Sequence, residues 1–210
     1  MIPLSLFDFQ ETPYVNFGAL FQEIKRHNVP DPNAMTLATV SSRNQPTARV
    51  VLFKGFYGEG WGFFTNYQGR KATELAHNSQ VGANFFWAQM AVQVRIDGFV
   101  EKLTREQNEE YFDSRPRLSQ LGAWASDQSK ELTSRDEIEN KLKEVESKFD
   151  GKDIPCPPHW GGFRILAREI EFWFGVEGRL HHRYVYSRQS KESFFEDPAQ
   201  IQWKRWMKNP

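Results

Sequence analysis

Basic residues at the end of a predicted strand and at a predicted helix start are the side chains best suited to bind an anion. Lys54 ends the apolar run RVVLFK, and Arg70 and Lys71 stand where a glycine turn meets a helix. Exposed backbone N–H groups at a helix start, together with two cations, favour a phosphate. The same Arg-Lys pair is also typical of solvated charge, so the spacing alone leaves both interpretations open.

A second phosphate site is predicted around Tyr111, Arg115 and Ser119. Tyr111 and Arg115 are one turn apart on a predicted helix and therefore share a face. Pro116 can start a new short helix that carries Ser119. These side chains would place a guanidinium between two hydroxyls, which suits a phosphate. A kinked helical corner with surface polar groups explains the same spacing.

The segment RLHHR, from Arg179 to Arg183, is predicted to be extended. Alternation along a strand would place Arg179, His181 and Arg183 on one face. Three such side chains in a row repel one another unless an anion or an acid meets them. Either a ligand or a buried acid, such as Glu169 or Glu171, would serve.

Two neighbouring features need separate interpretations. His181 and His182 are adjacent, so on a strand they point to opposite faces and cannot share one metal ion. No metal site is therefore predicted. Trp173, shortly upstream, is suited either to a planar heterocycle or to a core.

Composition excludes several functional classes. In 210 residues Lys plus Arg equals Asp plus Glu at 27 each, so no net field would hold nucleic acid or an anionic membrane surface. The sequence has no apolar run of membrane-spanning length, no Walker or dinucleotide glycine loop, no GxSxG and no HExxH. The one cysteine, Cys156, excludes an internal disulfide and favours a reducing, cytoplasmic compartment. Aromatic residues make up 15%, which indicates a large core, a dimer interface or a planar ligand.

The elements that must position these residues are mostly strands. Alternating or continuous apolar runs predict strands over residues 34–40, 48–56, 60–66, 81–88, 92–103, 163–175 and 180–188. Apolar residues at helical intervals predict a lead-in helix from Phe17 to His27. The sum is a β-barrel of α+β type, mostly antiparallel, with helices inserted at its periphery.

Two of the inserted helices should begin at capping boxes. Thr104 with Gln107 precedes a helix over 106–113, and Ser134 with Glu137 precedes one over 136–149. A brief helix over 70–77 follows the turn at Gly69. The 136–149 helix has one apolar stripe among Glu and Lys, which is typical of a surface helix lying on a sheet.

Taken together, the patterns resemble the pyridoxine 5′-phosphate oxidase family from about Asp31 to Arg188. The strings that carry the resemblance are DPNAMTLATV, RVVLFK, FFTN with GRK, the strand around Gln93, YFDSRPRLSQLGAWASDQS, WGGFR, EFW and RLHHR. The resemblance implies an FMN-binding split β-barrel that forms a single domain over residues 1–210. A lead-in helix region would occupy 1–30 and a C-terminal tail 189–210.

The resemblance also implies two sets of site residues. The residues implied to contact FMN are Arg49, Val50, Val51, Leu52, Phe53, Lys54, Phe64, Thr65, Arg70, Lys71, Gln93, Gln128, Ser129, Trp173 and Arg183. Those implied to hold the substrate phosphate are Lys54, Tyr111, Arg115 and Ser119. Arg179 and His181 are implied to lie against the pyridine ring and to be catalytic, because they would orient the substrate and stabilise charge developing at C4′.

The implied reaction belongs to vitamin B6 metabolism. Hydride would leave C4′ of pyridoxine 5′-phosphate or pyridoxamine 5′-phosphate for flavin N5, which would give pyridoxal 5′-phosphate. O2 would then reoxidise the flavin and yield H2O2. The family is homodimeric, with FMN at the subunit interface. A phenazine-pathway oxidase, a flavin reductase and a non-catalytic FMN or pyridoxal-phosphate binder are the alternatives. The sequence departs from the family pattern at His182, where an acid is common, in its N-terminal stretch and in the tail WKRWMKNP.

Overall fold

The computed structural model describes residues 4–188 and 202–210. Within these residues, nine strands form one sheet in the order β2-β1-β5-β6-β7-β4-β3, while β8 pairs with β7 and β9 with β8. Neighbouring strands run antiparallel. The strands are β1 (Ala34–Val40), β2 (Pro46–Leu52), β3 (Phe56–Tyr57), β4 (Gly60–Asn66), β5 (Gln80–Trp87), β6 (Val92–Lys102), β7 (Trp160–Phe174), β8 (His182–Ser187) and β9 (Lys204–Met207).

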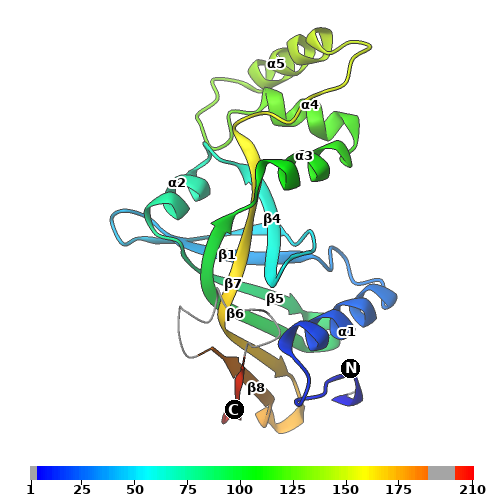
Figure 1. Cartoon of the computed structure of the whole chain (residues 1–210), viewed down its shortest axis with the longest axis vertical. Helices are drawn as coiled ribbons and strands as arrows, with labels where there is room; N and C mark the ends of the chain where they lie inside the picture. Colours follow the sequence, from blue (N-terminus) through cyan, green and yellow to red (C-terminus); the bar gives the residue numbers. More distant parts are fainter. Residues whose placement is uncertain (1–3, 189–201) are drawn as a thin grey trace.

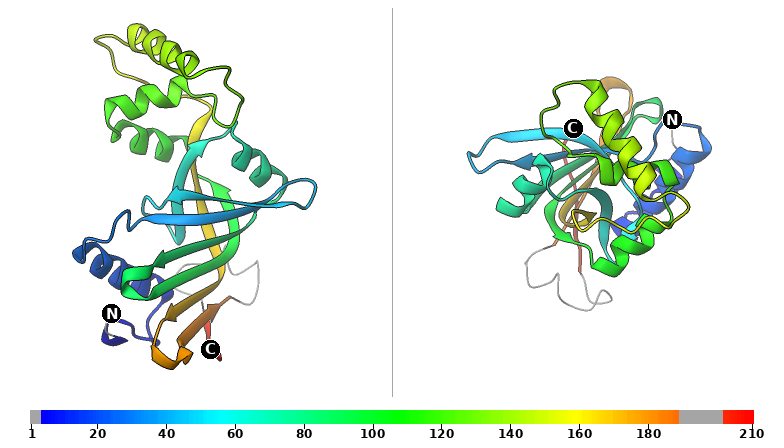
Figure 2. Two further views of the ribbon diagram at one scale, coloured as in Figure 1. Left: turned by 180° about the vertical axis from the view of Figure 1, so that it is seen from behind. Right: turned by 90° about the horizontal axis from the view of Figure 1, so that it is seen from above.

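The helices surround this sheet (Figure 1). They are α1 (Pro13–Arg26), α2 (Arg70–His77), α3 (Arg105–Asp113), α4 (Arg117–Ala125) and α5 (Arg135–Lys148), with short 3-10 turns η1 (Leu4–Leu6), η2 (Ala88–Met90) and η3 (Glu177–Arg179). Figures 1 and 2 show α3, α4 and α5 at one end of the long axis and β8 at the other. Among the described residues, no helix has both the length and the apolar character needed to cross a membrane.

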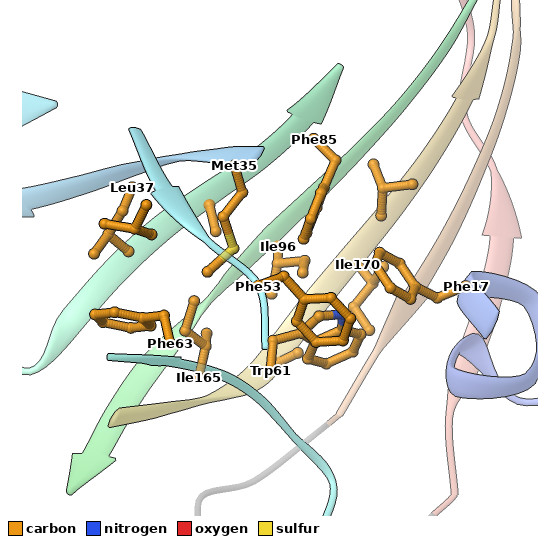
Figure 3. Close-up of a cluster of buried hydrophobic side chains, with 14 of the residues drawn as sticks. Phe17, Met35, Leu37, Phe53, Trp61, Phe63, Phe85, Ile96, Ile165 and Ile170 are labelled. Atoms are coloured by element: carbon orange, nitrogen blue, oxygen red, sulfur yellow. The ribbon is translucent and has the colours of Figure 1, made fainter. Parts of the chain in front are cut away.

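The main core lies between the curved sheet and α1, and aromatic rings dominate it (Figure 3). Phe17, Trp61, Phe63 and Phe85 are each 0% exposed. The ring of Phe17 lies 5.8 Å from that of Trp61 and 5.0 Å from that of Phe85. Buried and accessible residues alternate along β1, as expected for an antiparallel strand covered on one face. Much of the aromatic content is therefore used in the core.

A second, smaller core lies beneath α3, α4 and α5. Phe112, Leu121, Phe149 and Trp160 form its centre. The Trp124 ring lies 5.4 Å from Phe149, which follows the end of α5. α5 packs on α4. The prediction that this helix lies on a sheet is therefore wrong, because its apolar stripe is satisfied by another helix.

The predicted α+β class, with antiparallel strands and peripheral helices, is confirmed. α2 spans Arg70–His77 as predicted. The capping box at Thr104 is closed from both sides, because the Thr104 hydroxyl accepts from the N–H of Gln107 and the Gln107 side chain accepts from the N–H of Thr104. Ser134 makes no such bond, since Glu137 accepts from Thr133 instead.

Three predicted boundaries differ from the structure. α1 begins at Pro13, before Phe17, because the Thr12 hydroxyl caps the helix and proline suits its first turn. The run 48–56 divides into β2 and β3 at Gly55, whose φ of 114° breaks the strand. Part of the predicted C-terminal tail, residues 189–201, lies outside the described residues, and its last part forms β9.

Candidate functional site

One open pocket contains most of the predicted anion-binding residues. It has a volume of about 640 Å³ and is formed by β2, β4, the start of β7 and the helices α2, α3 and α4 with their connections. The predicted residues that line it are Arg49, Val50, Val51, Leu52, Lys54, Phe64, Thr65, Lys71 and Gln128 of the FMN set, and Tyr111, Arg115 and Ser119 of the substrate set. We call this the main pocket. It brings the two predicted sets together.

A smaller pocket of about 250 Å³ has part of its lining in common with the main pocket. It contains Arg70 and Ser129, the two remaining FMN-set residues near the helix start. Arg49, Lys71 and Gln128 line both pockets. The predicted phosphate site at the start of α2 is therefore a concave surface with three cationic side chains.

Lys71, which lines both pockets, is held by polar groups. Its Nζ donates to Thr65 Oγ1 at 2.8 Å and to Gln128 Oε1 at 2.6 Å. Burial, and next the charge of Arg49, lower the pKa of Lys71. A Cβ at Gly69 would lie 2.8 Å from Gln128 Oε1, so a larger residue here would displace the Gln128 side chain from its present position. Within the described part of the chain, Lys71 has no carboxylate partner, and an anion would supply the missing charge.

Arg49 and Arg70 share one buried carboxylate, that of Glu74. Arg49 Nη2 donates to Glu74 Oε2 and Arg70 Nε to Oε1, each at 2.9 Å. The Thr39 and Thr47 hydroxyls also donate to Oε2, at 2.5 and 2.8 Å. Burial alone would raise the pKa of Glu74, but these hydrogen bonds lower it to about 2. The sequence interpretation missed Glu74, although its position one helical turn after Arg70 was an available signal.

The predicted substrate-phosphate group lies across the main pocket. The Arg115 guanidinium lies 4.6 Å from the centre of a Trp160 ring. Its Nη1 atom is buried and has no hydrogen-bond partner among the described residues. Burial lowers the pKa of Arg115. Tyr111 stacks on Phe64 with ring centroids 3.9 Å apart, and Ser119 lies in the first turn of α4. An oxyanion would relieve the cost of the unpaired buried donor.

Phe53 and Lys54 are placed differently, although they are consecutive. Phe53 does not line either pocket; it is 6% exposed and its ring lies 5.4 Å from that of Phe17 in the core. Lys54 does line the main pocket, with Nζ 6.0 Å from the centre of the Tyr111 ring. Lys54 is therefore positioned to serve both predicted sets.

The sequence interpretation assigned no ligand contact to Ser114, Pro116 and Trp160, which line the main pocket. All three lie inside strings that had been noted, around SRPR and WGGFR. Nothing in the local pattern shows that Trp160 approaches Arg115, because the two belong to different elements, β7 and the α3–α4 connection.

A second group of predicted residues lies on the strands β6, β7 and β8. Gln93 pairs with Trp173, and Trp173 pairs with Arg183. Directly paired residues point to the same face, so these three form one cross-strand row. The His181 ring lies 4.6 Å from that of Trp173. Among the described residues that line the two pockets, none belongs to this row.

Arg179 does not extend the row along a strand. It ends η3 with a φ of 62°, and β8 begins only at His182. The expectation that Arg179, His181 and Arg183 alternate on one strand face is therefore wrong. Gly178, with a φ of 72°, turns the chain before the strand starts. Arg179 is left exposed, while His181 is half-buried.

Beside the row and on the same face of the sheet, Glu171 holds Arg183. Its Oε1 accepts from Arg183 Nε at 2.7 Å, and its Oε2 from Lys208 Nζ at 3.4 Å. Arg95 lies 3.9 Å away. Burial alone would raise the pKa of Glu171, but Arg183 and next Lys208 offset this, so that the pKa falls below its ordinary value. Of the interpretations left open, a buried acid is correct for Arg183.

The main pocket and the row lie at different ends of the molecule. β7 connects them, because it carries Trp160 of the pocket near its start and Trp173 of the row near its end. This length of strand spans on the order of 40 Å. Figures 1 and 2 show the same separation between α3 and β8. One chain alone therefore cannot bring both groups to one small ligand.

Comparison with known proteins identifies relatives along nearly the whole chain. Residues 21–149 match the family model described as pyridoxamine 5′-phosphate oxidase, and residues 160–207 match the pyridoxine 5′-phosphate oxidase C-terminal dimerisation region. A pyridoxine/pyridoxamine 5′-phosphate oxidase of Nostoc punctiforme is 46% identical over 185 residues, covering 88% of this chain and 86% of the relative. One of Burkholderia thailandensis is 46% identical over 183 residues, covering 87% and 85%.

Solved structures show the same fold. PhzG from Burkholderia lata, in complex with tetrahydrophenazine-1-carboxylic acid, has a TM-score of 0.86 at 25% identity, covering 100% of this chain and 98% of that one. A pyridoxamine 5′-phosphate oxidase-related, FMN-binding protein of Nostoc punctiforme has a TM-score of 0.73 at 16% identity, covering 95% and 99%. The fold is that of the FMN-binding split barrels, and the chain belongs to the pyridoxine/pyridoxamine 5′-phosphate oxidase family.

Proposed function

We propose that this chain binds FMN and oxidises pyridoxine 5′-phosphate or pyridoxamine 5′-phosphate to pyridoxal 5′-phosphate, with O2 as acceptor and H2O2 as second product. With the amine, water would hydrolyse the resulting imine and release ammonia as well. The observation that carries the proposal is the main pocket, in which Lys71 and Arg115 each lack an anionic partner among the described residues. Two phosphate sites in one pocket would hold cofactor and substrate together. Hydride transfer would then be an oriented, effectively unimolecular step.

The residues present fit a flavin phosphate and an isoalloxazine ring. Lys71, Arg49 and Arg70 supply charge at the phosphate end. Val50 and Leu52 offer apolar surface on β2, where they are 64% and 41% exposed. Apolar surface beside a few convergent polar groups is typical of a cofactor site. These features support FMN over a ligand without phosphate.

When bound, FMN supplies the acceptor for a hydride equivalent. The chain's own residues bind and orient. Lys54, Arg115 and the hydroxyls of Tyr111 and Ser119 would bind the substrate phosphate, and the Arg115 Nη1 donor would gain its missing partner. Charge-assisted hydrogen bonds of this kind are among the strongest in proteins and fix the position of the ring.

The cross-strand row would act on the same ligands from a second copy of the chain. We infer a homodimer in which Gln93, Trp173 and Arg183 of one chain face the FMN in the main pocket of its partner. Arg179 and His181 would then lie against the pyridine ring and hold charge at C4′. The separation of pocket and row within one chain supports this inference, as does the match to a dimerisation region. Exposure of Arg179 agrees with a role across an interface.

A second candidate is another split-barrel flavoenzyme, such as a phenazine-type oxidase. The likeness to PhzG over the whole chain favours it. The main pocket argues for a phosphorylated substrate instead, because Tyr111, Arg115 and Ser119 place two hydroxyls and a buried guanidinium in its wall.

The test is H2O2 release by the purified, flavin-loaded protein. With pyridoxine 5′-phosphate we expect H2O2 and pyridoxal 5′-phosphate in equal amounts, and with unphosphorylated pyridoxine little of either. Arg179→Ala should reduce turnover roughly tenfold or more while FMN is retained, whereas Leu180→Ala, at a neighbouring position that is 72% exposed, should not. A protein that oxidises tetrahydrophenazine-1-carboxylic acid but not pyridoxine 5′-phosphate would support the second candidate, and one that binds no flavin would refute both.

A further inference from the structure

Glu74 is an unexpected neighbour for a phosphate site. Its carboxylate lies on α2 one turn beyond Arg70 and Lys71, and it lines a polar groove next to the smaller pocket. It is 5% exposed, so water does not screen its charge effectively. A negative charge here would oppose the binding of a phosphate, unless the carboxylate also fixes the positions of the cations that bind it.

The hydrogen bonds show what the carboxylate does. Oε1 accepts from Arg70 Nε, and Oε2 accepts from Arg49 Nη2. The two arginines come from α2 and β2, which are separate elements of the fold. Thr47 supports the arrangement, because its hydroxyl donates to Glu74 at 2.8 Å and accepts from Arg49 Nη2 at 2.7 Å. One carboxylate therefore fixes two guanidiniums relative to each other.

The charges at this end of the site are also balanced for a phosphate. Arg49, Arg70 and Lys71 with Glu74 leave two positive charges in excess, which matches a phosphate dianion. The arginines keep surface available, since their side chains are 22% and 62% exposed. Long side chains lose much rotamer freedom on binding, and side chains that are already fixed lose less.

We propose that Glu74 is a positioning residue for the FMN phosphate, which it serves by holding Arg49 and Arg70 in the geometry that receives the phosphate oxygens. The inference rests on the proposed binding of FMN. It concerns the phosphate alone, because Glu74 does not line the main pocket that contains Val50 and Leu52, and both of its oxygens accept hydrogen bonds from threonine or arginine side chains.

The test compares FMN with riboflavin, which has the same ring but no phosphate. In Glu74→Gln, the Kd for FMN, measured by quenching of flavin fluorescence on the apoprotein, should rise roughly tenfold or more. The Kd for riboflavin should stay within about twofold of the wild-type value. A residue that served only the fold would weaken both ligands equally.

Glu101→Gln is the matched control. Glu101 accepts from Arg164 Nη2 at 2.8 Å and is partly buried, but it lines neither pocket. Both Kd values should therefore remain unchanged in this variant. Thr47→Val is a second variant for the case that Glu74→Gln does not fold, and it should raise the FMN Kd about threefold and leave the riboflavin Kd alone.

The outcomes separate this inference from the proposed function. If wild-type protein shows no preference for FMN over riboflavin, the proposed function fails and this inference with it. If the wild type prefers FMN but the variants keep the same FMN-to-riboflavin ratio, only the role of Glu74 is refuted. A tighter FMN complex in Glu74→Gln would also refute it, since the carboxylate would then oppose the phosphate.

Discussion

The region of the main pocket and the cross-strand row both fix arginine side chains with a carboxylate, but the partners of the two carboxylates come from different parts of the chain. Each holds arginines on a nearly buried carboxylate: Glu74 is 5% exposed and Glu171 is 3% exposed. The partners of Glu74 come from β1, β2 and α2, which follow one another closely in the chain. Those of Glu171 come from β6, β8 and the residue after β9, close to the end of the chain.

This difference shows which part of the site each segment of the chain controls. Glu74 and its arginines at the proposed phosphate end come from neighbouring segments, and only Gln128 and Ser129 among the named lining residues there come from farther along the chain, after α4. The row forms only when β8 and the chain end pack on β7, as the contacts of Arg183 with Asn209 and of Lys208 with Glu171 require. We therefore expect changes at the chain end to affect the row and not the pocket.

The largest expected effect tests the pocket alone. In Arg115→Ala the KM for pyridoxine 5′-phosphate should rise on the order of 100-fold, because the buried guanidinium is the central cation of the substrate-phosphate group. FMN content should remain, since Arg115 belongs to the other set. Steady-state kinetics on the flavin-loaded protein give the result. Arg135→Ala, whose side chain is 87% exposed on α5, is the control and should leave KM as it is.

A change in KM for both variants, or a loss of FMN in Arg115→Ala, would break the distinction between the two phosphate sites. Arg115→Lys should have a lower KM than Arg115→Ala but a higher one than the wild type, because lysine keeps the charge but not the forked geometry of the guanidinium.

The second prediction concerns acid stability. The pKa of Glu74 falls from 4.5 to about 2 on folding, so the folded state stabilises the ionised form. The stabilisation is complete above about 4.5 and is lost as pH falls toward 2, where the folded protein also takes up the proton. This corresponds to about 3 kcal/mol of unfolding free energy. In urea unfolding experiments between pH 5 and 3, the unfolding free energy of Glu74→Gln should change less with pH than that of the wild type.

Glu171→Gln extends the comparison, because the pKa of Glu171 is lowered too. Its unfolding free energy should likewise depend less on pH in this range. An acid dependence identical to the wild type in both variants would show that neither carboxylate carries the stabilisation assigned to it.

The smallest expected effect tests the chain end. Lys208→Ala removes a contact of 3.4 Å to Glu171 from a side chain that is 43% exposed, so it should weaken FMN binding only about two- to fivefold. The KM for pyridoxine 5′-phosphate should not change. Flavin fluorescence titration measures the first and kinetics the second. Lys204→Ala on β9 is the control, and an equal loss there would refute a specific role for Lys208.

Sequence patterns predict the fold well where the signal is local. The α2 boundaries, the Thr104 capping box and the antiparallel strands follow from short-range periodicity and turn chemistry. Arg179 could not be placed in the same way, because RLHHR alternates like a strand and only a positive φ at Gly178 and Arg179 prevents it.

The sequence predicted which residues line the main pocket better than it predicted how they contact one another. Residues of both sets line the main pocket, yet the approach of Trp160 to Arg115 and the hydrogen bonds from Thr39 and Thr47 to Glu74 join separate elements, which no local spacing reveals. The split of the predicted residues between pocket and row also depends on the path of β7, which is a property of the whole sheet.

The length of β7 has one more consequence. The strand runs from Trp160 to Phe174 with one β-bulge at Arg168, where its register with β6 shifts, and on each side of the bulge successive side chains point to opposite faces. Removing a single residue just after the bulge, such as Ile170, would turn the later side chains over: Trp173 would point toward the core, and Phe172, now 0% exposed, would point outward. Removing two would keep the faces and shorten the distance between pocket and row by about 7 Å. The number of residues between the bulge and Trp173, odd or even, therefore decides whether the far end of β7 presents Trp173 outward for binding.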